Sequence, residues 1–130
     1  FASLAGLEKA ISEGNSAEAE LATQRILLGH ALIAAWGGIP LVYMGDELAL
    51  LNDYSYRDIP DHAHDSRWVH RPLMDWSAAA QRHDRTTVAG QIFQGLRHIL
   101  QRRKATAALH AGVPTQILHC GHSCGPSTKH

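Results

Sequence analysis

The chain has 130 residues, which is enough for one domain with a modest hydrophobic core. Its 12 basic and 12 acidic residues cancel, so no net field favours a nucleic-acid partner or an acidic membrane surface. No run of apolar residues reaches the roughly 18 that a transmembrane helix needs, so no membrane partner is expected either.

The first part of the sequence has the pattern of two helices. Ser3 is a suitable N-cap for a short helix that Gly14 ends, with apolar residues spaced three and four apart between them. Asn15 and Ser16 both suit the N-cap of a second helix. The second half of that helix, residues 26–36, is almost entirely apolar, which indicates a helix buried between neighbours.

A short apolar run follows, and it predicts a buried strand over residues 39–44. Two glycines separate it from the helix, and Pro40 stands at its entrance, where a strand tolerates a missing N–H donor. Because apolar and polar residues do not alternate, the strand is expected to be covered on both faces, as in a parallel sheet. Asp46 and Glu47 come directly after it, at the end of a parallel strand that usually faces a ligand.

A long loop and a final helix complete the recognisable pattern. Residues 48–76 lack periodicity, and loops of this length inside a compact domain are usually functional or disordered. Their aromatic residues argue against disorder, so we expect an ordered loop of the kind that forms an active site. An apolar stripe then predicts a helix over residues 87–104, with basic residues in its last turns that suit the helix dipole. Residues 115–119 have the pattern of one further strand.

This order of elements predicts an α/β fold. One parallel strand cannot pair with itself, so the expected sheet needs neighbouring strands that the sequence does not contain. We therefore interpret the chain as a piece of a larger α/β protein, mostly helical as it stands. In isolation it would expose a sheet edge and the apolar faces of two helices, so aggregation is expected.

Six segments of the chain carry a family resemblance. Residues 38–47 (GIPLVYMGDE) resemble the eighth-strand motif of the α-amylase superfamily, the family 13 glycoside hydrolases. Five further segments resemble one subfamily, the amylosucrases: 2–10 (ASLAGLEKA), 51–54 (LNDY), 65–72 (DSRWVHRP), 81–84 (QRHD) and 90–97 (GQIFQGLR). The resemblance covers residues 2–119, which is nearly the whole chain.

The resemblance implies a partial TIM (β/α)8 barrel. Residues 1–110 would form the C-terminal part of the catalytic barrel, namely its last strand, the loop after that strand and the flanking helices. Residues 111–130 would be the truncated start of the β-rich C-terminal domain of this family, with an atypical tail from Cys120 onward.

The resemblance also implies an activity for the intact enzyme. Amylosucrases cleave sucrose, transfer the glucosyl unit to an α-1,4-glucan and release fructose, so sucrose and α-glucan would be the partners. The family mechanism is retaining, with an Asp nucleophile and a Glu acid/base, and it needs no cofactor. Those carboxylates belong upstream of the matched segments, so this chain is expected to hold no catalytic residue and to be inactive alone. The close alternative is another enzyme of the superfamily, an α-glucosidase or a trehalose-forming transglucosylase.

Arg67 is the strongest candidate for a substrate-binding residue. In the family that the chain resembles, the arginine of this motif closes the glucose pocket through a salt bridge to an upstream aspartate. A guanidinium can bind a carboxylate through two N–H groups while its remaining donors face sugar hydroxyls. The alternative is that Arg67 only holds its loop in place.

Four further residues are candidates for organising the loop: Asp46, Glu47, Asp65 and Trp68. Adjacent residues on a strand point to opposite faces, so Asp46 and Glu47 would not converge on one bond, and a catalytic role is disfavoured. Tyr54, Trp68 and Trp76 could stack on sugar rings, but anchoring of the loop is favoured because large aromatic side chains are commonly buried.

The end of the sequence holds a cluster of possible metal ligands: His119, Cys120, His122 and Cys124. Their spacing is too tight for the usual zinc modules, which separate two ligand pairs by about a dozen residues or more. We therefore predict no metal site. A small metal-binding module built on this tail is the alternative from a different functional class.

Overall fold

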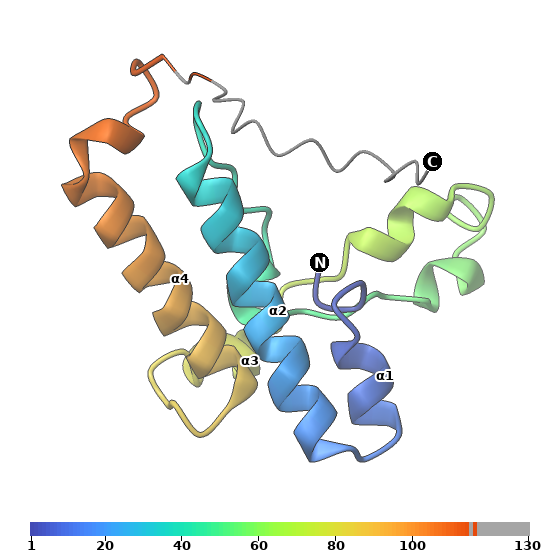
Figure 1. Ribbon diagram of the computed structural model, residues 1–130. Helices are drawn as coiled ribbons and strands as arrows, with labels where there is room; N and C mark the ends of the chain where they lie inside the picture. Colours follow the sequence, from blue (N-terminus) through green and yellow to red (C-terminus); the bar gives the residue numbers. More distant parts are fainter. Residues whose placement is uncertain (115, 117–130) are drawn as a thin grey trace, which may run out of the picture.

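The computed structural model describes residues 1–114 and 116. All regular secondary structure in this part of the chain is helical (Figure 1). The α-helices are α1 (Leu7–Ser12), α2 (Ser16–Ala35), α3 (Trp76–Ala80) and α4 (Val88–Ala105). Short 3₁₀ turns lie between and after them: η1 (Asp46–Leu48), η2 (Ser55–Asp58), η3 (Ser66–His70) and η4 (Ala107–Leu109). The helix predicted to start at Asn15 or Ser16 and the helix predicted over residues 87–104 are thus confirmed.

A local side-chain contact explains where α2 begins, whereas α1 begins without a side-chain cap. Asn15 accepts a hydrogen bond from the backbone N–H of Glu18 (3.0 Å) and so caps α2, which settles the choice between the two candidate caps. The predicted cap of α1 is wrong, because Gly6, with φ 95°, precedes that helix. The Ser3 hydroxyl instead accepts a hydrogen bond from the backbone N–H of Asn52 (3.0 Å), which ties the start of the chain to the long loop.

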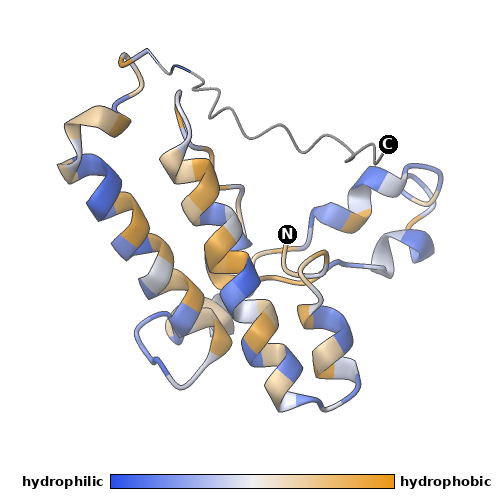
Figure 2. Cartoon of the chain, in the orientation of Figure 1, coloured by the Kyte–Doolittle hydropathy of each residue, from blue (hydrophilic) through white to orange (hydrophobic). Residues whose placement is uncertain are grey.

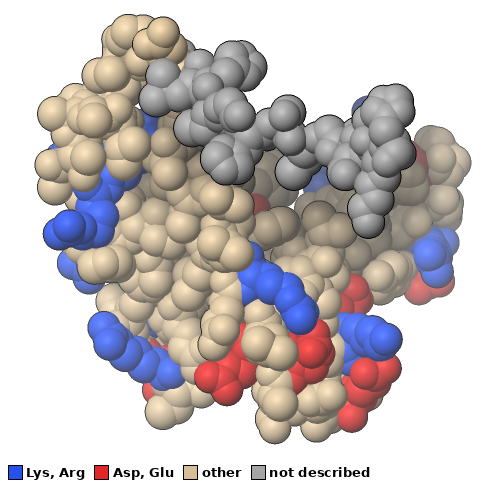
Figure 3. Space-filling model, in the orientation of Figure 1, with Lys and Arg blue, Asp and Glu red and all other residues tan. Residues whose placement is uncertain are grey.

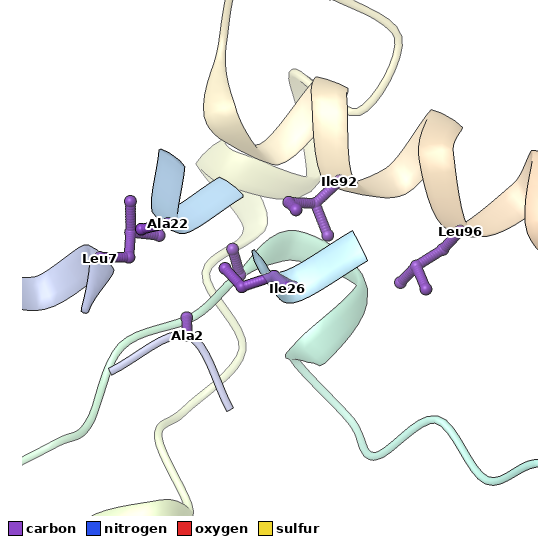
Figure 4. Packing of buried hydrophobic residues seen from close by; sticks show 7 residues of the cluster. Ala2, Leu7, Ala22, Ile26, Ile92 and Leu96 are labelled. Atoms are coloured by element: carbon purple, nitrogen blue, oxygen red, sulfur yellow. The ribbon is translucent and has the colours of Figure 1, made fainter. Parts of the chain in front are cut away.

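The hydrophobic core lies where α2 packs against α1 on one side and α4 on the other (Figure 4). Ile26 of α2 and Ile92 of α4 are fully buried in this contact. Leu7 of α1 and Leu96 of α4 extend the cluster along the two contacts. Burial of each large side chain contributes roughly 1.5–3 kcal/mol, so these few residues supply most of the apolar stabilisation of the helical body.

The second half of α2 is buried on one side only, at Ile26, His30 and Ala34, whereas the sequence predicted burial between neighbours. Leu28, Leu32 and Trp36 are 60%, 64% and 69% exposed. Figure 2 shows that this end of the helix is mostly apolar, with one hydrophilic band across it. The apolar run predicts that this part of the helix is buried on all sides. The described residues cover mainly the side that faces α4.

The predicted strand over residues 39–44 is wrong, and so is the prediction of a partial (β/α)8 barrel. The described residues contain no β-strand and no sheet, so the fold is small and all-helical rather than α/β. Residues 39–43 leave the end of α2 without regular secondary structure and lead into η1 (Figure 1). An apolar run predicts burial, but a strand also needs a second extended segment to receive its backbone hydrogen bonds, and the described chain provides none.

Several predictions concern the end of the chain. The strand predicted over residues 115–119 and the His/Cys cluster of the tail lie outside the described residues, apart from residue 116. The same holds for most of the predicted second domain, residues 111–130. Among the helices that the structure describes, none combines the length and the apolar character needed to cross a membrane.

Candidate functional site

A cavity of about 440 Å³ opens between the turn at η1 and the 3₁₀ turn η3. Polar or charged side chains make up much of its wall: Asp46, Asn52, Arg67, His70 and Arg71. Apolar groups, among them Tyr43 and Leu50, form the remainder. The volume falls within the range of small-molecule sites, and the mixed lining suits a polar ligand that also has apolar faces.

Asp65 and Arg67 form a local ion pair that fixes the start of η3. The Asp65 carboxylate accepts hydrogen bonds from the Arg67 backbone N–H (3.0 Å), from its Nε (2.9 Å to Oδ1) and from its Nη2 (2.8 Å to Oδ2). The hydrogen bond from the Arg67 side chain is the main reason that the pKa of Asp65 is lowered to about 2. The family resemblance implied an aspartate farther upstream, whereas here the partner is two residues away.

The same contacts leave part of the Arg67 guanidinium free. Its Nη1 makes no hydrogen bond to the described residues, and its side chain is 77% exposed at the edge of the cavity. Arg67 is therefore held by its own loop and can still donate to a ligand. The two roles weighed for Arg67 from the sequence are compatible in this geometry.

We expect the Arg67→Ala variant to raise the pKa of Asp65 from about 2 towards its ordinary value of 3.8. Because the folded-state pKa is the lower one, the pair stabilises the fold above about pH 4 and loses that contribution as the pH falls towards 2. An NMR titration of the carboxyl carbons measures the shift. Asp84, whose pKa is lowered by the Thr86 hydroxyl, is the internal control and should not change. An unchanged Asp65 would contradict the ion-pair assignment.

Asp46 and Glu47 face different cavities. Both belong to η1, a 3₁₀ turn that follows Gly45 with φ 94°. Asp46 Oδ1 lies 3.1 Å from the backbone nitrogen of Phe1 in the wall of the 440 Å³ cavity. Glu47 accepts a hydrogen bond from the backbone N–H of Gly45 (2.7 Å) and lines a separate groove against α4. The two carboxylates do not converge on one ligand, and Glu47 holds the turn.

A chain of hydrogen bonds that no sequence pattern predicts connects α1 with the cavity. The Tyr54 hydroxyl donates a hydrogen bond to Glu8 Oε2 (3.3 Å). The same hydroxyl oxygen of Tyr54 accepts a hydrogen bond from Asn52 Nδ2 (3.3 Å). Asn52 Oδ1 lies 3.2 Å from Nδ1 of His70. Asn52 and His70 also line a second hollow of about 500 Å³ beside α1. Glu8 and Tyr54 are 46 residues apart, so no local spacing could have revealed this contact.

Two aromatic candidates lie outside the wall of the cavity. Trp68 stacks on His62 with ring centroids 3.6 Å apart, and the Arg71 guanidinium lies 5.1 Å from its ring. Trp76 begins α3 and is 78% exposed. Neither ring lines the cavity, so a ligand there would meet the polar side chains and Tyr43 instead.

Within the described part of the chain, no three His, Cys, Asp or Glu side chains are grouped so that they could hold a metal ion. The chain matches no model of a known protein family. The site is therefore defined by its own geometry: a cavity of mixed polar and apolar lining with a tethered arginine at its edge.

Proposed function

We propose that the chain is part of a retaining glucosyltransferase that cleaves sucrose and transfers the glucosyl unit to an α-1,4-glucan, with release of fructose. The observation that carries the proposal is the placement of Arg67 at the edge of the cavity, tethered through Asp65 and with Nη1 free. The similarity of five segments to the amylosucrases supports sucrose as the sugar.

The lining of the cavity suits a sugar chemically. A sugar ring presents several hydroxyl groups in fixed directions, and each can both donate and accept a hydrogen bond. Arg67 and Arg71 supply donors, while Asp46 and Asn52 supply acceptors. The apolar wall around Tyr43 matches the C–H faces of a sugar ring.

In the proposed enzyme, this chain binds the sugar and does not break the glycosidic bond. A retaining mechanism needs two carboxyl groups about 5–5.5 Å apart on either side of that bond. Asp46 and Glu47 face different cavities, and Asp65 is occupied by Arg67. The nucleophile and the acid/base are therefore assigned to groups outside this chain.

A titration of the isotopically labelled chain with sucrose, followed by NMR, tests the proposal. We expect weak, saturable shifts at residues that line the cavity, and no release of fructose. Arg67→Ala should weaken sucrose binding by about 10-fold or more, because a hydrogen bond from a charged donor is lost. Arg102→Ala, an exposed arginine of α4, is the matched control and should bind like the parent chain.

Two comparisons sharpen this experiment. Asp65→Asn removes the ion pair but keeps the guanidinium, so it should cost less sucrose affinity than Arg67→Ala if Arg67 contacts the sugar. Maltose and trehalose should produce weaker shifts than sucrose. Equal shifts with all three sugars would favour another enzyme of the superfamily, and no saturable shift with any of them, or fructose released by this chain alone, would contradict the proposal.

A further inference from the structure

An uncharged apolar surface covers the end of α2 and the segment that follows it. Residues 26–45 contain no Lys, Arg, Asp or Glu. In Figure 3 many of the visible charged side chains gather along the left edge and the lower end of the molecule. Its large side chains are more than half exposed: Leu28, Leu32, Trp36, Ile39, Leu41 and Met44.

Residues 39–43 have the character of an unpaired edge. The first, third and fifth of these side chains are exposed, whereas the second and fourth are half-buried, which is the alternation of an extended chain with one face on the core. Within the described part of the chain, no backbone N–H of residues 37–44 donates a hydrogen bond. The carbonyl groups of residues 39–42 accept no hydrogen bond from the described residues either, whereas that of Tyr43 accepts one from the Asp46 N–H (3.0 Å). Free donors and acceptors of this kind are a template for pairing with another chain.

We propose that two copies of the chain associate through residues 39–43, which pair antiparallel across a twofold axis at Leu41. Pro40 has no N–H, so the pairing edge is the one to which the N–H groups of residues 39, 41 and 43 point. Leu41 then lies opposite its own copy, and Ile39 lies opposite Tyr43 of the other copy. The Tyr43 carbonyl oxygen, which accepts from the Asp46 N–H (3.0 Å), accepts the Ile39 N–H through its second lone pair. The interface is isologous, as closed dimers require.

The charge pattern favours a second copy as the occupant. Natural edge strands are usually protected from self-pairing by charged side chains, and residues 26–45 have none. The whole chain carries a formal net charge of zero, so no long-range repulsion keeps two copies apart. A strongly acidic or basic partner would find no complementary charge on this surface.

The available area fits a weak dimer. A fully exposed aliphatic side chain offers on the order of 100 Å² of apolar surface, and an aromatic one about 200 Å². When these areas are scaled by the exposed fraction of each side chain, the six large side chains of the uncharged surface and Tyr43 together provide roughly 600 Å² per copy. A standard interface buries roughly 800 Å² per partner. Association is therefore expected to depend on concentration.

Sedimentation velocity over a range of concentrations of the full chain tests the dimer. The double variant Ile39→Lys/Leu41→Lys places two like charges at the paired edge, and it should raise the dissociation constant by about 10-fold or more. The matched control is Leu4→Lys/Leu73→Lys, which adds the same charge at side chains that are 84% and 89% exposed, against 88% and 77% for the edge pair. The control should associate like the parent chain.

Amide hydrogen exchange, read residue by residue, tests the pairing itself. In concentrated samples the amides of residues 39, 41 and 43 should exchange more slowly than in dilute samples, whereas that of Val42 should not. A chain that stays monomeric at all concentrations overturns the proposal, as does a control variant that dissociates like the edge variant. A dimer without alternate protection also overturns it. Neither readout involves sugar binding, so this inference and the proposed function fail independently.

Discussion

Replacing Arg103 with methionine should lower the free energy of unfolding by about 3 kcal/mol, because it removes the group that caps the end of α2. Arg103 Nη1 donates to the carbonyl oxygens of Ala34 and Trp36 (3.1 Å to the latter), and Nη2 donates to that of Gly38. Arg103 is only 9% exposed, and methionine can occupy much of the same space. The expected loss therefore comes from the polar contacts rather than from packing.

The end of α2 depends on this arginine for two reasons. The last carbonyl groups of a helix have no partner within the helix and carry the negative end of its dipole. The last turn of α2 contains no basic residue of its own. Arg103 reaches across from α4 and supplies both the hydrogen bonds and the positive charge, so it joins the two helices at the point where residues 39–43 begin.

Urea unfolding followed by helical circular dichroism measures the effect. Arg102→Met is the matched control, because it removes the same charge from the adjacent, exposed position and should change the stability by less than about 0.5 kcal/mol. Arg103→Lys should recover less than half of the loss, since an ammonium group cannot reach three carbonyls as a planar guanidinium does. Equal stability of the Arg102 and Arg103 variants would rule out the capping role.

The elements that the sequence predicted correctly are those that local signals determine. The bounds of α4 follow from the Thr87 cap and an apolar stripe that repeats along one face. Residues 39–44 were misread because an apolar run indicates that side chains avoid water, but it does not indicate where backbone hydrogen bonds go. In the described residues no partner segment exists, and the same run is exposed and unpaired.

In the candidate site, too, contacts between residues near in the sequence could be predicted, whereas contacts between distant residues could not. Asp65 and Arg67 are two residues apart, and an aspartate that caps a turn while binding a nearby arginine is within reach of sequence reasoning. The contact of Glu8 with Tyr54 spans 46 residues and depends on how α1 packs. Arg103 was expected to act on the dipole of its own helix, and its contacts with the end of α2 lie more than 60 residues away along the chain.

Gly90→Ala should destabilise the fold by about 2 kcal/mol, although alanine is the better helix former by about 1 kcal/mol. A Cβ on Gly90 would overlap the carbonyl oxygen of Asp84 and lie 3.0 Å from that of Gln81. Both are backbone atoms of the loop that leads into α4, so the loop has to move. The Thr87 hydroxyl donates to Asp84 O (2.9 Å) and accepts from the Gly90 N–H (3.1 Å), and this cap would be broken with it.

Three variants separate this mechanism from a general intolerance of side chains on α4. A Cβ on Gly95 would meet only the end of the Leu27 side chain, 2.5 Å from Cδ2, and that side chain can rotate away. Gly95→Ala should therefore change the free energy of unfolding by less than about 1 kcal/mol.

Thr87→Ala should lower the free energy of unfolding by about 1 kcal/mol through loss of the cap. If Gly90→Ala acts by displacing the cap, the double variant Thr87→Ala/Gly90→Ala must cost less than the two single changes added together. Strict additivity would mean that the cap survives and that the loss in Gly90→Ala arises elsewhere.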